Sequence, residues 1–504
     1  MNSIPHRGLI IAAVMLATII EVLDMTIVNV SLPHMMGSLG ANTQEITWVL
    51  TAYIVSAAIC MPLTGFLSKR FGQKRLLLVS IAGFLVSSVL CGASTDLTEM
   101  LVFRTFQGIF GASLVPLSQT ILQSVFPKEE QSKAMAIWGV GVMIAPVLGP
   151  TLGGYITQTM NWRWIFYINI PVCIFTFFLV FRYLNETVRE KVPVDLVGLI
   201  LMTLGIGSLQ IFLDQGNSNN WFQSSFITYL AILAVCALTI FIIRGYNKKD
   251  NIVNLRLFAD KNFALSTIML ALFVACMFGI LALLPIMLEE LMNYPAMTTG
   301  LVMGPQGLTS ALGMATSVAL LKRVDPRRIM FVGLLLEISG SYLMTRWGAS
   351  FEMRNVITSM MLMGFGMGLF FVPITTLAYY TMAKSDIAEG SGLFSFSRNL
   401  GSSIGISILS TIFTRQSQVN WNQLSGHLRA DNPAVQQWLS AHHLTLNDPL
   451  AMQLLGQTLS QQANLIAFID SFWVVNIAFI SLLALVFFFK RVDLSKAEGL
   501  GFIE

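Results

Sequence analysis

Charge is scarce in this sequence. Asp, Glu, Lys and Arg together make up 11% of the 504 residues, against roughly 25% in soluble domains. Apolar residues make up 55%. A water-soluble enzyme of this size is excluded, because its surface would need far more polar residues. An intrinsically disordered chain is excluded as well, since such chains are polar or highly charged.

Cysteine and histidine are also few. The five cysteines all lie in apolar runs without a C-x-x-C pair, so we expect small buried hydrophobes rather than a disulfide scaffold or a metal site. The five histidines all lie away from the centres of these runs, which argues against a histidine proton relay. Phosphate-loop, nucleophile-elbow and zinc-protease motifs are missing from the sequence. We therefore expect no cofactor, no metal and no enzymatic activity.

Long apolar runs are what the chain has in abundance. A helix that spans a bilayer needs roughly 20 apolar residues. Fourteen runs qualify: residues 9–32, 46–68, 75–93, 97–121, 134–158, 164–183, 195–213, 226–244, 263–289, 297–321, 328–346, 356–380, 391–415 and 467–490. We predict an all-α membrane protein with 14 transmembrane helices. The even count places both termini on the same side.

The distribution of basic residues predicts which side that is. With the N-terminus in the cytoplasm, the inner segments carry 23 Lys and Arg residues, the outer segments carry five, and two lie within spans. Positive residues favour the cytoplasmic side, so we predict that both termini are cytoplasmic. This placement also explains the net charge of +4 by contact with membrane lipid, without nucleic acid as a partner.

The connections hold one long segment and one internal repeat. Residues 416–466 form a predicted outer loop of 51 residues, with a helix start at Asp448-Pro449. The basic pairs at 69–70 and 322–323 are 253 residues apart, and the GxxxG motifs at 149 and 401 are 252 apart. Two related halves with a site between them are typical of transporters, although basic loops and GxxxG motifs are common enough to agree by chance.

Ionisable groups within the spans are candidates for function, because burying them in lipid is costly. Glu21 and Asp24 lie three residues apart on the first span, and Arg104 lies on the fourth. Asp24 and Arg104 should both lie about 10–12 Å below the outer surface. An Asp24–Arg104 pair that includes Glu21 is therefore possible, and protonation of Asp24 would weaken it. Alternatively, Asp24 and Arg104 only tie the two helices together.

Three further charges stand in or near spans. Glu337 and Arg398 are expected to be buried, while Glu389 begins a span and is expected at the surface. The fifth span carries Pro146, Gly149, Pro150, Gly153 and Gly154. Such a helix is bent and approaches its neighbours closely. We interpret it as a moving interface rather than as ordinary packing.

Taken together, the motifs resemble the major facilitator superfamily, and within it the EmrB-like branch of fourteen-span drug:proton antiporters. The residues that carry this resemblance are Leu23-Asp24-x-Thr26-x-x-Asn29, Gly65-x-x-x-Lys69-Arg70-x-Gly72-x-Lys74-Arg75, Arg104-x-x-Gln107-Gly108, Gly149-Pro150-x-x-Gly153-Gly154 and Trp162-Arg163-Trp164 with Asn169 and Pro171. The resemblance covers nearly the whole chain. It implies a major facilitator fold with two six-helix bundles, residues 1–190 and 263–504, and two inserted helices in residues 191–262.

The resemblance also implies roles for particular residues. Asp24, with Arg104 and the extra acid Glu21, is expected to couple protons. The substrate cavity candidates are Asp24, Asn29, Gln107, Glu337 and Arg398. The gating residues are Gly65, Arg70, Gly72 and Arg75, and the antiporter hinge comprises Pro146, Gly149, Pro150 and Gly153. This chain has Lys69 where the gating motif usually has an acid, which puts the usual inner charge latch in doubt.

These observations predict a proton-coupled antiporter that exports hydrophobic toxic compounds by alternating access from the inner membrane of a Gram-negative bacterium. The resemblance implies an EmrA-like periplasmic adaptor and a TolC-like outer-membrane channel as partners, with 416–466 as the contact loop. The same loop could be a solvated connection without a partner. The close alternative is a dedicated exporter of one metabolite, such as a siderophore or a fatty acid. A membrane-embedded enzyme and a non-transporting receptor are more distant alternatives.

Overall fold

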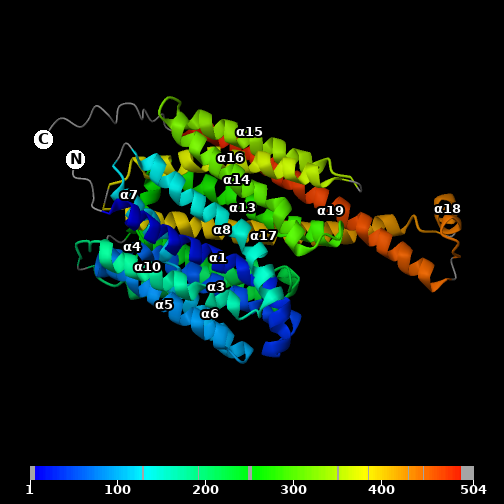
Figure 1. The fold of residues 1–504 in the computed structure, drawn as a ribbon, viewed down its shortest axis with the longest axis horizontal. Helices are drawn as coiled ribbons and strands as arrows, with labels where there is room; N and C mark the ends of the chain where they lie inside the picture. The colour runs from blue at the N-terminus through cyan, green and yellow to red at the C-terminus, as the bar shows by residue number, and fades with distance from the viewer. Residues whose placement is uncertain are drawn as a thin grey trace.

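The structure is a computed structural model, and it describes residues 6–127, 130–190, 192–247, 252–348, 351–383, 385–429, 431–445 and 448–489. Within these ranges the regular structure is helical. Figure 1 shows two groups of helices side by side, one built from the first part of the chain and one from the last part. The beginning of α1 and the end of α19 lie at the same end of the bundle.

The first group is built from ten α-helices and one short 3₁₀ turn. They are α1 (Arg7–Leu39), α2 (Thr43–Ile46), α3 (Trp48–Cys60), η1 (Met61–Leu63), α4 (Thr64–Phe71), α5 (Gln73–Ala93), α6 (Leu97–Gly111), α7 (Leu114–Val125), α8 (Gln131–Thr159), α9 (Trp164–Tyr167) and α10 (Asn169–Tyr183), with η1 as a short 3₁₀ turn. Two spans are interrupted: η1, which contains Pro62, separates α3 from α4, and Ser113 lies between α6 and α7.

The rest of the chain forms two connecting helices and the second group. These are α11 (Leu196–Gln215), η3 (Trp221–Gln223), α12 (Ser225–Asn247), η4 (Leu255–Ala259), α13 (Lys261–Glu290), α14 (Ala296–Leu321), α15 (Pro326–Thr345), α16 (Met353–Tyr380), α17 (Ile387–Ser425), α18 (Pro433–Ala441), α19 (Pro449–Leu485) and η5 (Val486–Phe488). Aspartates cap several of these helices. The side chains of Asp260, Asp325 and Asp448 accept hydrogen bonds from backbone N–H groups in the first turn of α13, α15 and α19.

Eleven helices in the described residues are long and apolar enough to cross a membrane, or twelve if the bent helix α8 counts as one span. The predicted spans 297–321 and 391–415 correspond to α14 and α17, which are not among them. Both helices are rich in Gly, Ser and Thr, which lowers their hydropathy. Helix α14 packs against α8 and α16, and helix α17 packs against α13.

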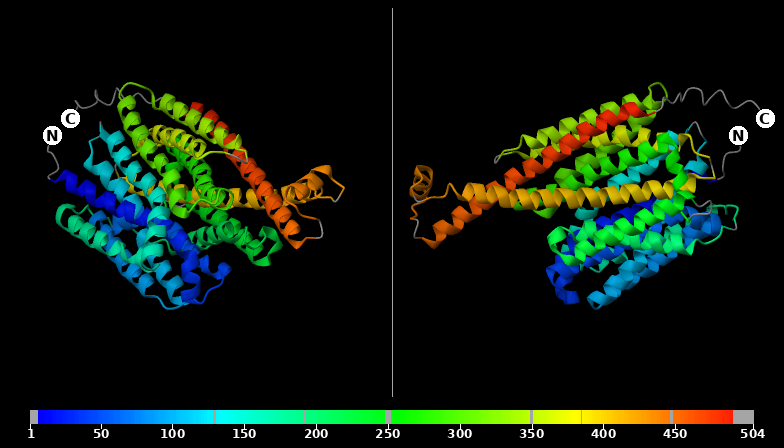
Figure 2. Two further views of the ribbon diagram at one scale, coloured as in Figure 1. Left: turned by 45° about the vertical axis from the view of Figure 1, so that its right-hand side comes forward. Right: turned by 180° about the vertical axis from the view of Figure 1, so that it is seen from behind.

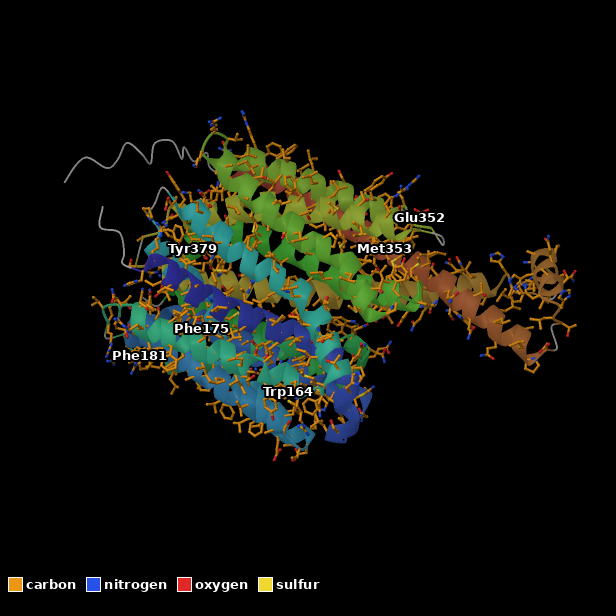
Figure 3. The ribbon with its side chains drawn as sticks, in the orientation of Figure 1. Trp164, Phe175, Phe181, Glu352, Met353 and Tyr379 are labelled. Atoms are coloured by element: carbon orange, nitrogen blue, oxygen red, sulfur yellow. The ribbon has the colours of Figure 1, made fainter. Side chains whose placement is uncertain are left out.

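The outside of the bundle is apolar. Figure 3 labels Trp164, Phe175 and Phe181 along the outer side of α9 and α10, and their exposed fractions are 51%, 57% and 60%. Tyr379 and Met353 lie near opposite ends of α16, which runs the length of the second group. Large apolar side chains at this exposure are stable in lipid rather than in water.

Small residues permit the closest helix contacts. Gly401 and Gly405 on α17 lie against α13, where an added Cβ on Gly405 would stand 1.9 Å from the carbonyl oxygen of Ala275. In the first group, an added Cβ on Gly149 of α8 would stand 2.1 Å from the Thr26 hydroxyl on α1. The two GxxxG motifs therefore serve corresponding helix contacts, α8 with α1 and α17 with α13.

The segment 416–466, predicted as a long outer loop with helical pieces, is largely helical. Residues 416–425 continue α17, residues 449–466 begin α19, and α18 lies between them. Figure 2 shows these segments projecting together beyond the bundle. The helix start expected at Asp448-Pro449 is confirmed. Apolar contacts hold α18 against the start of α19. The residues in contact are Val435, Leu439, Ala451 and Leu455.

Candidate functional site

An ion pair between Asp24 and Arg104 lies at the centre of the first group. Arg104 Nη1 donates to Asp24 Oδ2 at 2.6 Å, and both side chains are fully buried. Asp24 lies on α1 and Arg104 on α6, at the similar depths expected from the sequence. The predicted pairing is therefore confirmed. In a low-dielectric surrounding the geometry must be good to offset the desolvation of both charges.

The second oxygen of Asp24 is held by two amides. Gln107 Nε2 and Asn169 Nδ2 each donate to Asp24 Oδ1 at 3.0 Å. Ser88 Oγ accepts from Asn169 at 3.0 Å, so α5 also joins the network. Four helices, α1, α5, α6 and α10, therefore orient one carboxylate. Neither Asn169 nor Ser88 was predicted as a partner of Asp24, although Asn169 stands in the motif that begins at Trp162.

Arg104 is fixed on its other sides as well. Its Nε donates to the backbone carbonyl of Val49 at 3.2 Å, and its Nη1 also donates to Gln107 Oε1 at 2.7 Å. The guanidinium carbon lies 4.3 Å from the ring centroid of Tyr53, within the range of a cation–π contact. The buried Nη2 atom has no partner among the described residues. Any loss of charge on Asp24 would leave this cation poorly compensated.

Glu21 does not join this network, contrary to the shared network considered from the sequence. Both of its carboxylate oxygens are buried without a hydrogen-bond partner in the described residues. The Tyr53 hydroxyl lies beside Glu21 but forms no hydrogen bond with good geometry. Arg398 from the second group interacts with Glu21 electrostatically, but it donates no hydrogen bond to either Glu21 oxygen. Glu21 therefore faces the contact between the two groups, whereas Asp24 faces the interior of the first.

The other cavity candidates lie apart from Asp24. Arg398 on α17 lies 5.8 Å above the ring of Trp138 on α8, between the two groups. Glu337 on α15 is fully buried, and its oxygens have no partner among the described residues. Cys276 on α13 is a neighbour of Glu337, which places Glu337 inside the second group. Asn29 is exposed on α1. Their roles stay predictions.

A charge pair joins the two groups at the end where the termini lie. Lys69 Nζ on α4 donates to Glu389 Oε1 on α17 at 2.7 Å. The helices also touch through Gly65, where an added Cβ would stand 2.5 Å from the Cα atom of Glu389. The expectation that Glu389 is a surface group was wrong, since its side chain is 17% exposed. The latch doubted from the sequence is present, with the signs of charge reversed.

The remaining gating residues hold the adjacent turn. Gly72 has a φ of 89°, a conformation that side chains rarely adopt. Glu186 accepts hydrogen bonds from the backbone N–H groups of Lys74 and Arg75. Arg70 lies exposed, with its guanidinium carbon 5.8 Å from the ring of Phe71. These contacts anchor the start of α5 to the segment after α10.

Reversing the charge of Lys69 should loosen the contact between α4 and α17. In Lys69→Glu two carboxylates would face each other, and the loss of a half-buried pair costs about 1 kcal/mol, or about a fivefold change in population. A cysteine introduced at Ser391, which is buried against Thr120, should react about fivefold faster with a water-soluble thiol reagent. The cysteine is introduced into a variant in which the five natural cysteines have been replaced, so that only position 391 reacts.

The double variant Lys69→Glu/Glu389→Lys should return labelling to the original rate, because it restores an attractive pair. Arg354→Glu is the matched control, since Arg354 pairs with Glu352 at an exposed position. Equal labelling rates in all four chains would show that the pair does not hold the two groups together.

The antiporter motif bends α8 and brings it onto α1. The pieces Gln131–Pro146 and Thr151–Thr159 meet at 44°. An added Cβ on Gly153 would stand 2.7 Å from the carbonyl oxygen of Ile27, so α8 can lie this close only where side chains are missing. Pro146 faces α13 and α16 across an apolar pocket. The side chain of Pro150 lies outside the described residues, and the hinge role stays a prediction.

Comparisons with known proteins bear on this arrangement. The Major Facilitator Superfamily profile matches residues 14–406. The fatty acid resistance protein FarB of Neisseria gonorrhoeae is 35% identical over 480 residues, which are 94% of each chain. The multidrug export protein EmrB of Escherichia coli (strain K12) is 34% identical over 486 residues, which cover 95% of this chain and 94% of that relative.

Solved structures share the fold at much lower identity. The proton:xylose symporter XylE aligns with a TM-score of 0.63 at 12% identity, over 99% of this chain and 100% of that one. The human organic anion transporter MFSD10 aligns with a TM-score of 0.60 at 14% identity, over 94% of this chain and 100% of that one. At this identity the likeness concerns the arrangement of helices alone.

Proposed function

The chain belongs to the Major Facilitator Superfamily, and from this premise we propose that it exports hydrophobic toxic compounds in exchange for protons. It is a transporter rather than an enzyme, since the relatives named above are a multidrug export protein and a resistance protein of similar length. The proposed reaction is alternating access between the two groups of helices. Substrate enters from the cytoplasm or the inner leaflet, and a proton enters from outside.

The observation that carries the proposal is the buried pair of Asp24 and Arg104. Its 2.6 Å contact and the two amide donors fix both oxygens of the Asp24 side chain. A proton on Asp24 would remove the charge that compensates Arg104, and so change the relative free energies of two arrangements of α1 and α6. A proton that binds one conformation better than the other can drive export in this way.

The energy of one proton is sufficient for the task. A charge that crosses with the membrane potential releases roughly 2.3 kcal/mol per 100 mV. At about 1.4 kcal/mol per tenfold change in concentration, one proton supports a substrate gradient of roughly 40-fold per 100 mV. ATP is therefore not needed.

The proposed topology has fourteen spans with both termini in the cytoplasm. It treats α14 and α17 as spans that are buried among other helices, and it rests on the 23 basic residues of the inner segments against five in the outer ones. The proposed domains are residues 1–190, the inserted helices of 191–262, and 263–504. The proposed location is the inner membrane of a Gram-negative bacterium.

The projection formed by the end of α17, α18 and the start of α19 is the proposed contact with an EmrA-like adaptor that leads to a TolC-like channel. Val419 and Trp421 on α17 are 46% and 44% exposed, and Met452 on α19 is 62% exposed. Apolar groups on a segment that projects into water mark a contact with another protein. Trp421→Ala/Met452→Ala should weaken binding to a purified adaptor without changing proton flux in vesicles. Unchanged binding would remove the projection from the interface.

The test of export uses everted vesicles, or proteoliposomes, whose interior has been made acidic. Hydrophobic cations, uncouplers and weak acids are added one at a time, and a pH-sensitive dye reports the internal pH. Each exported substrate should release protons at a rate that saturates with its concentration. Vesicles without the protein are the control. If no compound releases protons above this control, the proposed antiport is wrong.

A dedicated exporter of a fatty acid remains the second candidate, because the relative named for fatty acid resistance is as similar as the multidrug relative. The same assay separates the two functions. A dedicated exporter should respond to saturated fatty acids and to no other class in the panel.

A further inference from the structure

The interior of the second group repeats part of the network around Asp24. Asn476 Nδ2 on α19 donates to Ser341 Oγ on α15 at 2.9 Å, just as Asn169 Nδ2 on α10 donates to Ser88 Oγ on α5 at 3.0 Å. The two serines are 253 residues apart, which is also the offset between the basic pairs of the two inner loops. Helices α15 and α19 therefore correspond to α5 and α10.

The second group also holds a buried acid at this level. Glu337 lies one turn before Ser341 on α15, and the Ser341 hydroxyl donates to the backbone carbonyl of Glu337 at 2.8 Å. The Glu337 side chain is fully buried, and Cys276 on α13 is its titratable neighbour. Helix α13 corresponds to α1, the helix of Asp24. Each group therefore encloses a carboxyl group among corresponding helices.

The second group differs from the first in that no cation compensates its acid. Both oxygens of Glu337 are buried without a hydrogen-bond partner among the described residues. The Asn476 amide donates to the carbonyl of Ile338 and to Ser341 instead. The other charged residues on α13, α14, α15, α16 and α19 lie two or more helical turns from the level of Glu337, and they are Lys261, Glu289, Glu290, Arg327, Arg328, Arg354 and Asp470. An isolated carboxylate in such a position costs far more free energy than a neutral carboxyl group.

A proton is the occupant that fits this position. A divalent metal cation needs about six oxygen ligands, and no group of three His, Cys, Asp or Glu side chains in the described ranges could hold one. An organic cation has no space, because α15 and α16 touch beside Glu337. An added Cβ on Gly366 would stand 2.7 Å from the carbonyl oxygen of Gly333 and 3.2 Å from the backbone nitrogen of Glu337. A proton on the carboxyl group needs neither further ligands nor space.

We infer that Glu337 is a second proton-binding site, which holds its proton in this arrangement of helices and gives it to water in another arrangement of the transport cycle. In that step the O–H bond of the carboxyl group breaks and the carboxylate remains. Cys276 lines a cavity of about 320 Å³ between α13, α17 and α19, so a movement of α13 would change the surroundings of Glu337. The inference rests on the proposed export function and deepens it, because Asp24 and Glu337 together exchange two protons for one substrate.

Infrared spectroscopy measures this protonation state without transport. For the full chain in nanodiscs at neutral pH, Glu337→Gln should remove one C=O stretching band of a protonated carboxyl group, whereas exposed glutamates are ionised at this pH. Glutamine has the size of the neutral acid, so the variant should fold. Glu352→Gln is the matched control, because Glu352 is 71% exposed, and it should leave the band in place. Identical bands in wild type and Glu337→Gln would overturn the inference.

Charge movement tests whether this proton takes part in export. Ethidium carries one positive charge, so its exchange for two protons moves one net charge per cycle, whereas its exchange for one proton is electroneutral. In proteoliposomes with equal pH on both sides, a potential of 100 mV, negative on the cytoplasmic face, should support a roughly 40-fold ethidium gradient in wild type and none in Glu337→Gln. Liposomes without protein give the passive distribution of ethidium.

A pH gradient should drive ethidium in both proteins, since Asp24 still exchanges its proton in Glu337→Gln. Glu337→Asp keeps a carboxyl group and should keep the response to potential. A Glu337→Gln protein that responds to potential as wild type does would overturn the second proton site and leave export standing, as would a wild type that responds to the pH gradient alone. If neither force moves ethidium in wild type, the proposed export of hydrophobic cations fails, and the infrared band alone decides whether Glu337 holds a proton.

Discussion

Proteoliposomes containing Asp24→Asn should show no more substrate-driven proton release than liposomes without protein. Asparagine keeps the size of the side chain and an acceptor oxygen, but its amide does not bind a proton at physiological pH. Arg104 would keep its hydrogen bonds to Val49 and Gln107 and lose its only ion-pair partner in the described residues. The measurement is the initial rate of pH-dye response after addition of substrate.

The same variant should be less stable, because breaking a buried pair leaves an uncompensated charge and costs about 3–5 kcal/mol. The double variant Asp24→Asn/Arg104→Gln removes both charges, so it should recover much of that stability while proton release stays absent. Urea unfolding in mild detergent measures the difference. Wild-type proton release in the double variant would show that Asp24 only ties helices together, and attention would move to Glu21 and Glu337.

Gly405→Ala should separate α17 from α13 and lower the stability of the second group. The added methyl would lie 1.9 Å from the Ala275 carbonyl oxygen and 2.5 Å from its Cα atom. These are backbone atoms, so no side-chain rotation relieves the overlap. Overpacking at such a contact costs typically 1–3 kcal/mol and occasionally more, and here the whole helix must move. A fall in the midpoint of thermal unfolding measures it.

Gly456→Ala and Gly304→Ala are the matched controls. Both glycines lie inside helices, and an added Cβ at either position meets nothing within 4 Å. Alanine favours a helix over glycine by about 1 kcal/mol, so these variants should be as stable as wild type or slightly more stable. A Gly405→Ala protein as stable as the controls would show that α13 and α17 are less closely packed than the structure has them.

The pairing of Asp24 with Arg104 was predictable because depth in a membrane can be counted along the sequence. The turn of Glu21 away from this pair was not. Residues three apart share a helix face only approximately. On α1 this small difference in direction points Asp24 into the first group of helices and Glu21 towards the contact between the two groups. Asn169 was also missed, because its motif gives no depth relative to Asp24.

The charge pair of Lys69 with Glu389 and the projecting helices of residues 416–466 were not predictable from the sequence. Lys69 and Glu389 are 320 residues apart, and the sequence holds no signal that α4 and α17 meet. Residues 416–466 lack the length of apolar run that predicts a span, so they were interpreted as a loop. Contacts between α17 and α19, such as the hydrogen bond of Ser417 with Asn464, join their helices.

The sequence by itself determined that this is a helical membrane protein, how its apolar runs are spaced, and which few charged residues must be accommodated among them. These follow from composition and spacing, because lipid excludes charge and requires helices. Only the tertiary structure decided which charges are paired. Asp24 is paired with Arg104 within the first group, and Lys69 is paired with Glu389 across the two groups. Arg398 has no hydrogen-bonding partner in the described chain. The sequence could not decide this, because pairing depends on distances of a few ångströms between residues far apart in sequence.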